Sequence, residues 1–203
     1  MAQCVNDKRW NVYYDVYAGR PPRETLLKAL ELLGSGDGRQ AIDLGCGAGN
    51  DTFEMLQQGW QVLALDKQAE AVKRVWAGCP AGTQPSLSTQ IVGFEEMAHL
   101  PPAMLVNASL SLPFCQPQLF GQVWQQVVDA LRPGGYFAGH LLGKKDSWAN
   151  LPDLTTLTQT ELELLLTPFE VVHYLEEEKD EPTVTGKMKH WHIYSLVIGK
   201  PKR

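Results

Sequence analysis

Apolar runs and amphipathic stretches alternate along this chain from about residue 22 to its end. Residues 41–45 (AIDLG) and 61–66 (QVLALD) are short apolar runs that stop at a glycine or an aspartate, which is typical of buried parallel strands. Further runs of this kind predict five more strands, near residues 89–93, 104–108, 136–143, 170–178 and 190–200. The acidic run Glu176–Glu181, between the last two strands, is expected to form a solvated turn.

Between the strands, apolar residues recur at helical spacing. They predict helices near residues 21–34, 50–59, 68–77, 117–135 and 158–167. In the longest of these, Leu119, Val123 and Val127 form one apolar stripe, and two glycines end the pattern. The alternation of strands and helices predicts an α/β, doubly wound sheet that ends in an antiparallel hairpin.

Length and composition support one domain over residues 1–203, with an aromatic amino-terminal lid segment (1–21) and a core (22–200). The net charge of −5 leaves no broad positive field for a nucleic acid. No signal-peptide pattern or membrane-spanning run is recognised in the sequence. The cysteines are scattered and are expected to be reduced thiols: Cys4, Cys46, Cys79 and Cys115. We therefore expect a cytoplasmic protein that acts on a small molecule, without nucleic-acid or membrane partners, and a monomer by default, although a weak dimer stays open.

The stretch AIDLGCGAGND contains three glycines at alternate positions, 45, 47 and 49. Such glycines allow a sharp turn from strand to helix and bring backbone amides close to a ligand. The stretch lacks the Gly-Lys-Ser/Thr ending of a phosphate-binding loop, and Asn50 replaces the last glycine or alanine of a dinucleotide fingerprint. Asp43 would repel a pyrophosphate but attract an ammonium or a sulfonium ion, and S-adenosylmethionine carries both. Asp66, at the end of the next strand, is placed to accept ribose hydroxyls in either cofactor class.

Together with VLALD, LRPGGYFAG and the ending HWHIYSLVIGK, this loop resembles the class I S-adenosylmethionine-dependent methyltransferases. The similarity is greatest to small single-domain tellurite-resistance and thiol methyltransferases. It implies a Rossmann-like, mostly parallel seven-stranded sheet of order 3-2-1-4-5-7-6, with an antiparallel last strand and helices on both faces. The implied activity is methyl transfer from S-adenosylmethionine to a thiol, a metalloid oxyanion or another small metabolite. An NAD-dependent oxidoreductase and a non-catalytic protein that binds S-adenosylmethionine are the alternatives.

The resemblance also implies roles for individual residues. The methionine part of the cofactor would be held by Asp43 and the loop residues Gly45, Cys46, Gly47 and Gly49. Asp66 would hold the ribose, with Lys67 beside the adenine. After the third strand the sequence departs from the family pattern, because it has Phe94 and Glu95 where an aspartate is common; these two either contact the adenine or leave Glu95 solvated.

Three further residues are expected at the cofactor. Asn107 would accept the cofactor ammonium through its backbone carbonyl. Tyr14 would close over the sulfonium and Arg20 would pair with the methionine carboxylate, unless the aromatic segment only anchors the terminus.

The acceptor side is predicted from position along the strands. Its candidates are Tyr13, Ser109, Phe114, His140, Trp148 and His190. His140 and Tyr14 are weak candidates for a catalytic group, and a structural role for His140 is the alternative. His190 and His192 share one strand face. No third ligand is apparent beside them, so no metal site is expected.

Overall fold

The computed structural model describes residues 7–202, with side chains from Trp10 onward. Cys4 and residues 1–6 of the expected lid segment lie outside the described residues, as does Arg203. The sheet has seven strands in the order β3-β2-β1-β4-β5-β7-β6, so the predicted fold class is confirmed. The strands are β1 (Gln40–Leu44), β2 (Gln61–Asp66), β3 (Leu87–Ile91), β4 (Ala103–Ala108), β5 (Leu131–Leu142), β6 (Glu170–Pro182) and β7 (Met188–Gly199). The first five are parallel, whereas β7 runs antiparallel to both β5 and β6.

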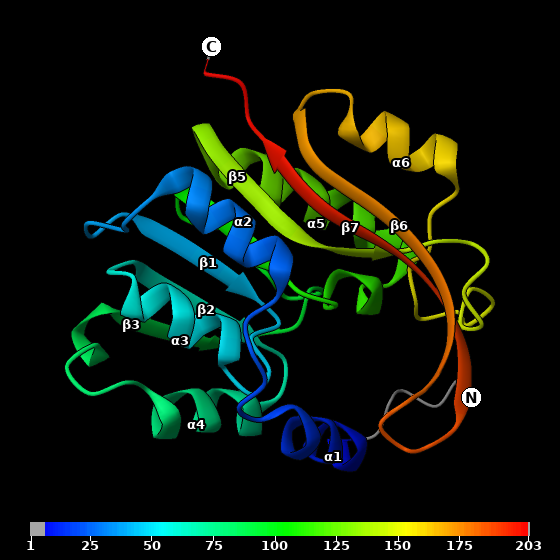
Figure 1. Ribbon diagram of the computed structural model, residues 1–203, viewed down its shortest axis with the longest axis horizontal. Helices are drawn as coiled ribbons and strands as arrows, with labels where there is room; N and C mark the ends of the chain where they lie inside the picture. Colours follow the sequence, from blue (N-terminus) through cyan, green and yellow to red (C-terminus); the bar gives the residue numbers. More distant parts are fainter. Residues whose placement is uncertain (1–6, 203) are drawn as a thin grey trace.

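Helices cover both faces of this sheet (Figure 1). One apolar layer packs beneath α2 (Glu24–Leu33), α3 (Asn50–Gln57) and α4 (Ala69–Gly78). The other packs beneath α5 (Pro117–Ala130) and α6 (Gln159–Leu166). The predicted stripe on α5 is confirmed, because Val123 and Val127 are fully buried against the sheet. A further helix, α1 (Asp7–Tyr17), was not predicted, and two short 3-10 turns lie at Gln84–Ser86 and Leu112–Phe114.

The segment LRPGG differs from its prediction. It was expected to close the helix, but α5 ends at Ala130 and β5 begins at Leu131. Leu131 pairs with Ala103 of β4, and the register then shifts before Leu105 pairs with Tyr136. Gly134 adopts φ +78° in this irregular stretch, and its N–H donates to the Lys200 carbonyl. The glycines therefore form a bulge within the strand rather than a loop before it.

The acidic run Glu176–Glu181 also differs from its prediction, because it lies within β6 and not in a turn. Its residues pair with His190 to Tyr194 and with Lys189 on β7, and the chain reverses afterwards, with Thr183 N donating to the Lys187 carbonyl. Since β6 is the outer strand of the sheet, these charged side chains stay largely in solvent while the backbone is paired.

The carboxyl ends of β1, β2 and β4 meet at one edge of the sheet, and the amino-terminal part of β7 lies at the same edge because that strand is reversed. Helix α1 lies there as well, since the Tyr14 hydroxyl reaches Asp66 at the end of β2. This gathers residues from distant parts of the sequence into one candidate site.

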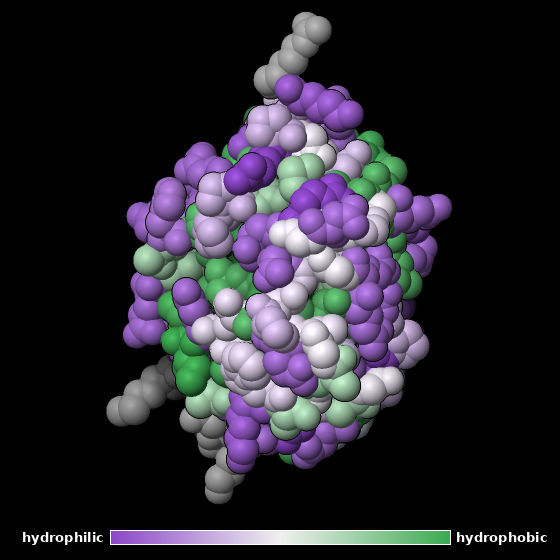
Figure 2. Space-filling model, turned by 90° about the vertical axis from the view of Figure 1, so that its left-hand side faces the viewer, coloured by the Kyte–Doolittle hydropathy of each residue, from purple (hydrophilic) through white to green (hydrophobic). Residues whose placement is uncertain are grey.

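The surface shown in Figure 2 is mainly hydrophilic, with smaller apolar groups between the polar ones. Within residues 7–202, no helix has the length and apolar character needed to cross a membrane.

Candidate active site

A small cavity opens beside the glycine loop. Its lining includes residues from the amino-terminal segment, β1, the loop, α3 and the end of β4: Tyr13, Arg20, Asp43, Cys46, Asp51 and Ser109. Predicted cofactor and acceptor residues thus share one cavity.

Gly45 and Gly49 of the loop are required both by their backbone conformation and by the lack of space for a side chain. Gly45 and Gly49 have φ of +74° and +90°, which L side chains rarely adopt. A Cβ at Gly45 would lie 2.4 Å from Cβ of Ser111, and one at Gly49 would lie 2.6 Å from the Phe53 ring. The neighbouring Cys46 is buried, and burial raises the pKa of its thiol well above the usual value. The thiol is therefore a packed neutral group of the loop rather than a thiolate.

Two buried carboxylates lie below this loop. Asp43 ends β1 with 2% of its surface exposed, and Asp51, in the first turn of α3, has 4%. Asn107 donates from Nδ2 to Asp43 Oδ1 at 2.8 Å and to Asp51 Oδ2 at 3.3 Å. Burial and the nearby charge of Asp51 raise the pKa of the Asp43 carboxyl above its ordinary range. The prediction for Asn107 concerned its backbone carbonyl, but its side chain is what joins the two acids.

A cation pairs with one of these acids. The Arg20 guanidinium lies 3.2 Å from Asp51 Oδ1, and it also lines the cavity. Asp43 instead accepts hydrogen bonds from two neutral side chains, Asn107 and Thr52. Asp51 was quoted in the motif but given no role, because an acid in a first helical turn is commonly only a favourable helix-terminal charge.

Asp66 ends β2 and is nearly enclosed. Its Oδ2 accepts the Gly47 N–H at 3.0 Å, and its Oδ1 accepts the Gln68 N–H at 2.8 Å. Burial still raises the pKa of this carboxyl despite these hydrogen bonds. The Tyr14 hydroxyl donates to Oδ1 from 3.4 Å, and the Tyr14 ring lies against Gly47. Tyr14 therefore contacts both the loop and Asp66, the carboxylate that is expected to bind the ribose.

The expected adenine side is more open. Lys67 and Glu95 form an exposed ion pair, which lowers the pKa of the Glu95 carboxyl. Phe94 is half-buried and packs against the core below α5. These three residues lie just beyond the ends of β2 and β3, and their contact with adenine stays a prediction.

Three of the six predicted acceptor residues, Tyr13, Phe114 and Trp148, belong to a chain of aromatic rings. The Trp10 ring lies 5.8 Å from Tyr13 and 4.9 Å from Phe114. Phe114 lies 6.3 Å from Trp148, and Trp148 lies 5.5 Å from Trp191. This aromatic chain runs from α1 across the sheet edge to β7. Ser109, which lines the cavity, donates its hydroxyl to Asn107 Oδ1 at 3.3 Å.

A buried ion pair stands behind the aromatic chain, and sequence reasoning missed it. The Lys189 ammonium pairs with Asp146 and lies 4.4 Å from the Trp148 ring and 3.7 Å from the Trp191 ring. Asp146 also accepts the backbone N–H groups of Trp148 and His192. The sequence KHWH contained a signal for this contact, because side chains alternate along a strand and Lys189 therefore lies on the same face as Trp191.

His140 is buried on β5, one position after Gly139, which pairs with Ala108. It does not line the cavity beside the glycine loop. Burial, followed by the charge of Arg23, lowers the pKa of His140 to about 4. The ring is thus neutral near pH 7 and poorly suited to take a proton.

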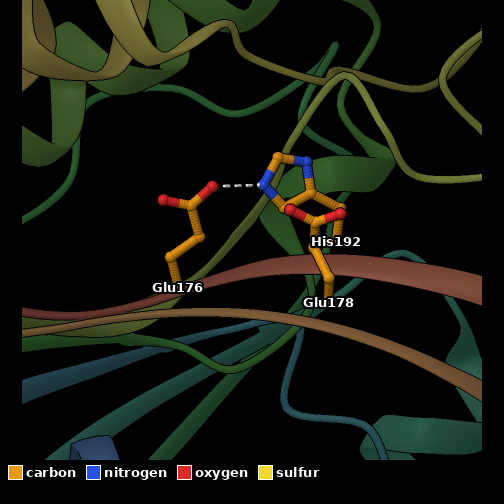
Figure 3. A group of neighbouring side chains, drawn as sticks. All are labelled: Glu176, Glu178 and His192. Carbon is orange, nitrogen blue, oxygen red and sulfur yellow. Dashed lines mark hydrogen bonds and ion pairs between the residues drawn. The ribbon is translucent and has the colours of Figure 1, made fainter.

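His190 does not line the cavity. Its ring lies 2.9 Å from Asp180 and 3.6 Å from Glu178, toward β6. His192, two residues further along the same face, lies with Glu176 and Glu178 in a group of potential metal ligands, shown in Figure 3.

The hydrogen bonds of His192 oppose metal binding at this group. The Lys145 N–H donates to Nδ1 at 3.2 Å, so Nδ1 is the acceptor and Nε2 carries the proton, which it donates to Glu176 at 2.8 Å. A metal at Nε2 would have to displace that proton, and Glu178 is already paired with Lys145. The arrangement fits a surface network of ion pairs.

Comparisons with known proteins agree with the fold. A family model described as a methyltransferase domain matches residues 41–135. An uncharacterised methyltransferase of Synechocystis sp. is 30% identical over 125 residues, which cover 62% of this chain and 57% of that protein. Trans-aconitate 2-methyltransferase of Deinococcus radiodurans is 29% identical over 125 residues, covering 62% of this chain and 46% of that protein. The chain thus spans about half the length of the curated relatives it matches.

Among solved structures, TehB from Haemophilus influenzae superimposes with a TM-score of 0.74 at 14% identity, over 93% of this chain and 65% of that protein. This similarity concerns the fold. Residues 41–135 thus match the model of a methyltransferase domain family, and the described chain shares its fold with TehB.

Proposed function

We propose that this chain is an enzyme that transfers the methyl group of S-adenosylmethionine to a small-molecule acceptor. The observation that carries the proposal is the buried carboxyl of Asp43 beside the glycine loop, which accepts hydrogen bonds from Asn107 and Thr52 and forms no ion pair among the described side chains. The ammonium and sulfonium groups of S-adenosylmethionine would compensate the negative charge of this carboxyl. The pyrophosphate of a nicotinamide cofactor would be repelled by it, which argues against an oxidoreductase.

The proposal gives each part of this cofactor its own residues. Asp43 and the glycine loop, which line the cavity, would hold the methionine end, and Arg20 would pair with its carboxylate. Asp66, which accepts the Gly47 N–H of the loop, would hold the ribose hydroxyls, and the Lys67–Glu95 pair with Phe94 would contact the adenine. These assignments rest on the contacts around the cavity and on the family resemblance.

S-adenosylmethionine, when bound, supplies a methyl group already activated by its positively charged sulfur. The protein has to align the acceptor with that methyl group and keep water away. The ring of Tyr13, which lines the cavity, and the rings of Trp10 and Tyr14 packed beside it would serve the second purpose. A thiol, a metalloid oxyanion and another small metabolite are all candidates for the acceptor.

Calorimetric titration with S-adenosylhomocysteine and then with NAD tests the cofactor. We expect micromolar binding of the first and no binding of the second. Binding of NAD alone would overturn the proposal. Turnover is tested by incubating the protein with S-adenosylmethionine and a panel of thiols, oxyanions and organic acids, and by measuring methylated product by mass spectrometry. Binding without any methylated product across a broad panel would favour a non-catalytic protein.

A further inference from the structure

Asp51 is a buried acid at the cavity that has no role in the proposed function. It lies in the first turn of α3, has 4% of its surface exposed and lines the cavity together with Arg20 and Asp43. A carboxylate buried to this extent is costly unless other groups compensate its charge. Its contacts therefore indicate its role.

The two oxygens of Asp51 face different partners. Oδ1 accepts the backbone N–H of Arg23 at 3.1 Å and lies 3.2 Å from Nη1 of Arg20. Oδ2 accepts a hydrogen bond from Nδ2 of Asn107 at 3.3 Å, and the same Nδ2 donates to Oδ1 of Asp43 at 2.8 Å. One amide thus fixes Asp51 relative to Asp43, and Asp51 in turn fixes Arg20.

The Asn107 amide can serve both acids in one orientation only. The Ser109 hydroxyl donates to Asn107 Oδ1 at 3.3 Å, which directs Nδ2 toward the two carboxylates. The opposite orientation would place the amide oxygen against Asp43. Asn107 is fully buried, so solvent does not compete for these contacts.

Arg20 keeps donors available for a ligand. Nη1 makes both of its contacts, with Asp51 and, at 2.6 Å, with the Pro21 carbonyl. Nε and Nη2 form no hydrogen bond with the residues that the structure describes. Since Arg20 lines the cavity, its guanidinium can still bind a carboxylate there while Asp51 holds it in place.

We infer that Asp51 is a positioning residue: it holds the Arg20 guanidinium at a fixed place relative to the Asp43 carboxyl, so that the site recognises both charges of an amino-acid end. This inference rests on the proposed function, in which Asp43 binds the ligand ammonium and Arg20 the ligand carboxylate. The two charged groups of an amino-acid end are attached to one carbon atom, so the ligand fixes their separation. An arginine that is already held at the matching separation loses less rotamer freedom on binding.

The alternative is that Asp51 only stabilises α3 and the loop before it. Methylthioadenosine distinguishes the two roles, because it has the adenosine and the sulfur of S-adenosylhomocysteine but lacks the amino-acid end. A residue that positions Arg20 affects the binding of S-adenosylhomocysteine alone. A residue that only maintains the fold affects the binding of both ligands.

The test is calorimetric titration of the full chain with each of these two ligands. We expect Asp51→Ala to weaken binding of S-adenosylhomocysteine by about tenfold or more and to leave binding of methylthioadenosine within about twofold of the wild type. Asp51→Asn keeps an acceptor for Arg20 and should lose less. Glu54→Ala removes an acid from the same helix outside the cavity and should leave both affinities unchanged. Thermal melting shows whether each variant retains its fold.

A double-mutant cycle tests whether Asp51 acts through Arg20. Arg20→Met should cause the same selective loss. The double variant Arg20→Met/Asp51→Ala should then bind S-adenosylhomocysteine within about threefold of Arg20→Met, because the second substitution removes a group that has nothing left to hold.

A selective loss in Asp51→Ala that disappears in the Arg20→Met background supports the inference. Equal weakening of both ligands, an unchanged affinity for S-adenosylhomocysteine, or losses that multiply in the double variant overturn it, and the proposed function stands. A wild type that binds methylthioadenosine as tightly as S-adenosylhomocysteine also overturns it, because the amino-acid end is then not recognised. If the wild type binds neither ligand, the proposed function itself fails.

Discussion

At the scale of single residues, Asp43 shows how burial prepares a charge for a ligand. Burial and the nearby acid Asp51 disfavour ionisation of its carboxyl until a cation arrives, although hydrogen bonds from Asn107 and Thr52 favour the ionised form. The same arrangement costs the ligand-free protein stability as the pH rises through the raised pKa of Asp43, and it makes cofactor binding depend on pH.

We expect the affinity for S-adenosylhomocysteine to fall as the pH is lowered from about 7.5 to about 5.5. Below the raised pKa of Asp43, the ligand ammonium must displace a proton from that carboxyl, which costs up to about tenfold in affinity per pH unit. Calorimetry across this range measures the slope. Asp43→Asn should bind more weakly with little pH dependence, and a slope equal to that of the wild type would exclude Asp43 as its source.

Asp66→Ala should weaken binding of S-adenosylhomocysteine by about 1.5–3 kcal/mol, the range for hydrogen bonds to a charged group. The variant also loses the acceptor for the Gly47 and Gln68 amides, which loosens the loop in the same direction. Asp129→Ala, at an exposed position on α5, is the matched control. Equal affinity in Asp66→Ala and wild type would show that the ribose is bound elsewhere.

Lys189→Met should destabilise the protein by about 3–5 kcal/mol, because Asp146 would remain charged and buried without its partner. Urea unfolding of the variant measures the loss in the free energy of unfolding. The double variant Lys189→Met/Asp146→Asn removes both charges and should lose less than the single one. A single variant as stable as the wild type would contradict this account of the pair.

At this scale, the sequence predicted the positions of residues that belong to a known motif, and it did not predict the positions of the other site residues. Asp43 and Asp66 end apolar strands, so their burial could be inferred. Asp51 and Lys189 could not be assigned, because their surroundings come from residues distant in the chain. For Asp51 these are Arg20 and Asn107, and for Lys189 they are Asp146 and Trp148.

At the scale of elements, helix α1 bears most directly on the site. Its Tyr14 hydroxyl takes a place at Asp66 that ribose hydroxyls would need, and Arg74 of α4 lies over the Tyr14 ring and pairs with Asp15. The helix is therefore tied both to the end of β2 and to α4. Entry of the cofactor would require at least the hydroxyl contact to be exchanged.

Tyr14→Phe should tighten binding of S-adenosylhomocysteine by up to about fivefold, because the variant no longer offers a competing donor to Asp66. The bond is long, so the gain is limited to about 1 kcal/mol. Calorimetry compares the variant with Tyr136→Phe, a half-buried tyrosine on β5. Weaker binding in Tyr14→Phe would instead mean that the hydroxyl contacts the bound ligand.

The apolar periodicity predicted which segments form helices and which form strands, but it did not predict where each element ends. The pairing of Leu131 with Ala103 and that of the Glu176–Glu181 run with β7 depend on partner strands that no local pattern reveals. The charged residues of β6 suggested a turn because charged side chains are usually exposed to solvent. The side chains of an edge strand are exposed on one side as well, so the charges did not distinguish a turn from an edge strand. Helix α1 was missed because its aromatic residues lack a clear apolar stripe in sequence.

At the scale of the whole molecule, β6 is an outer strand of the sheet, and its exposed edge is where we expect copies of the chain to pair or to repel one another. Its first half exposes Val171, Val172 and Leu175, whereas its second half carries the acidic run. Apolar edges invite pairing between copies, and like charges oppose it. The tendency of two copies to pair along β6 therefore depends on how much of the strand carries charged side chains.

We expect sedimentation velocity to show a monomer at low ionic strength and micromolar concentration. The double variant Glu177→Gln/Glu181→Gln should associate more readily, because two repelling charges on the edge strand are removed. Glu54→Gln/Glu96→Gln, on α3 and in the turn after β3, removes the same net charge and controls for charge alone. A stable dimer of the wild type at low salt would contradict this expectation.

The aromatic chain from α1 to β7 gives the molecule a reporter of its own. Indole emission responds to the charge and polarity around the ring, and Trp10 lies on the helix that covers the cavity while Trp148 and Trp191 flank the Lys189 ammonium. A displacement of α1 from Phe114 would alter the surroundings of Trp10 first and those of Trp148 next. Opening and closing over the cavity can therefore be followed optically in the unlabelled protein, on the timescale of rapid mixing.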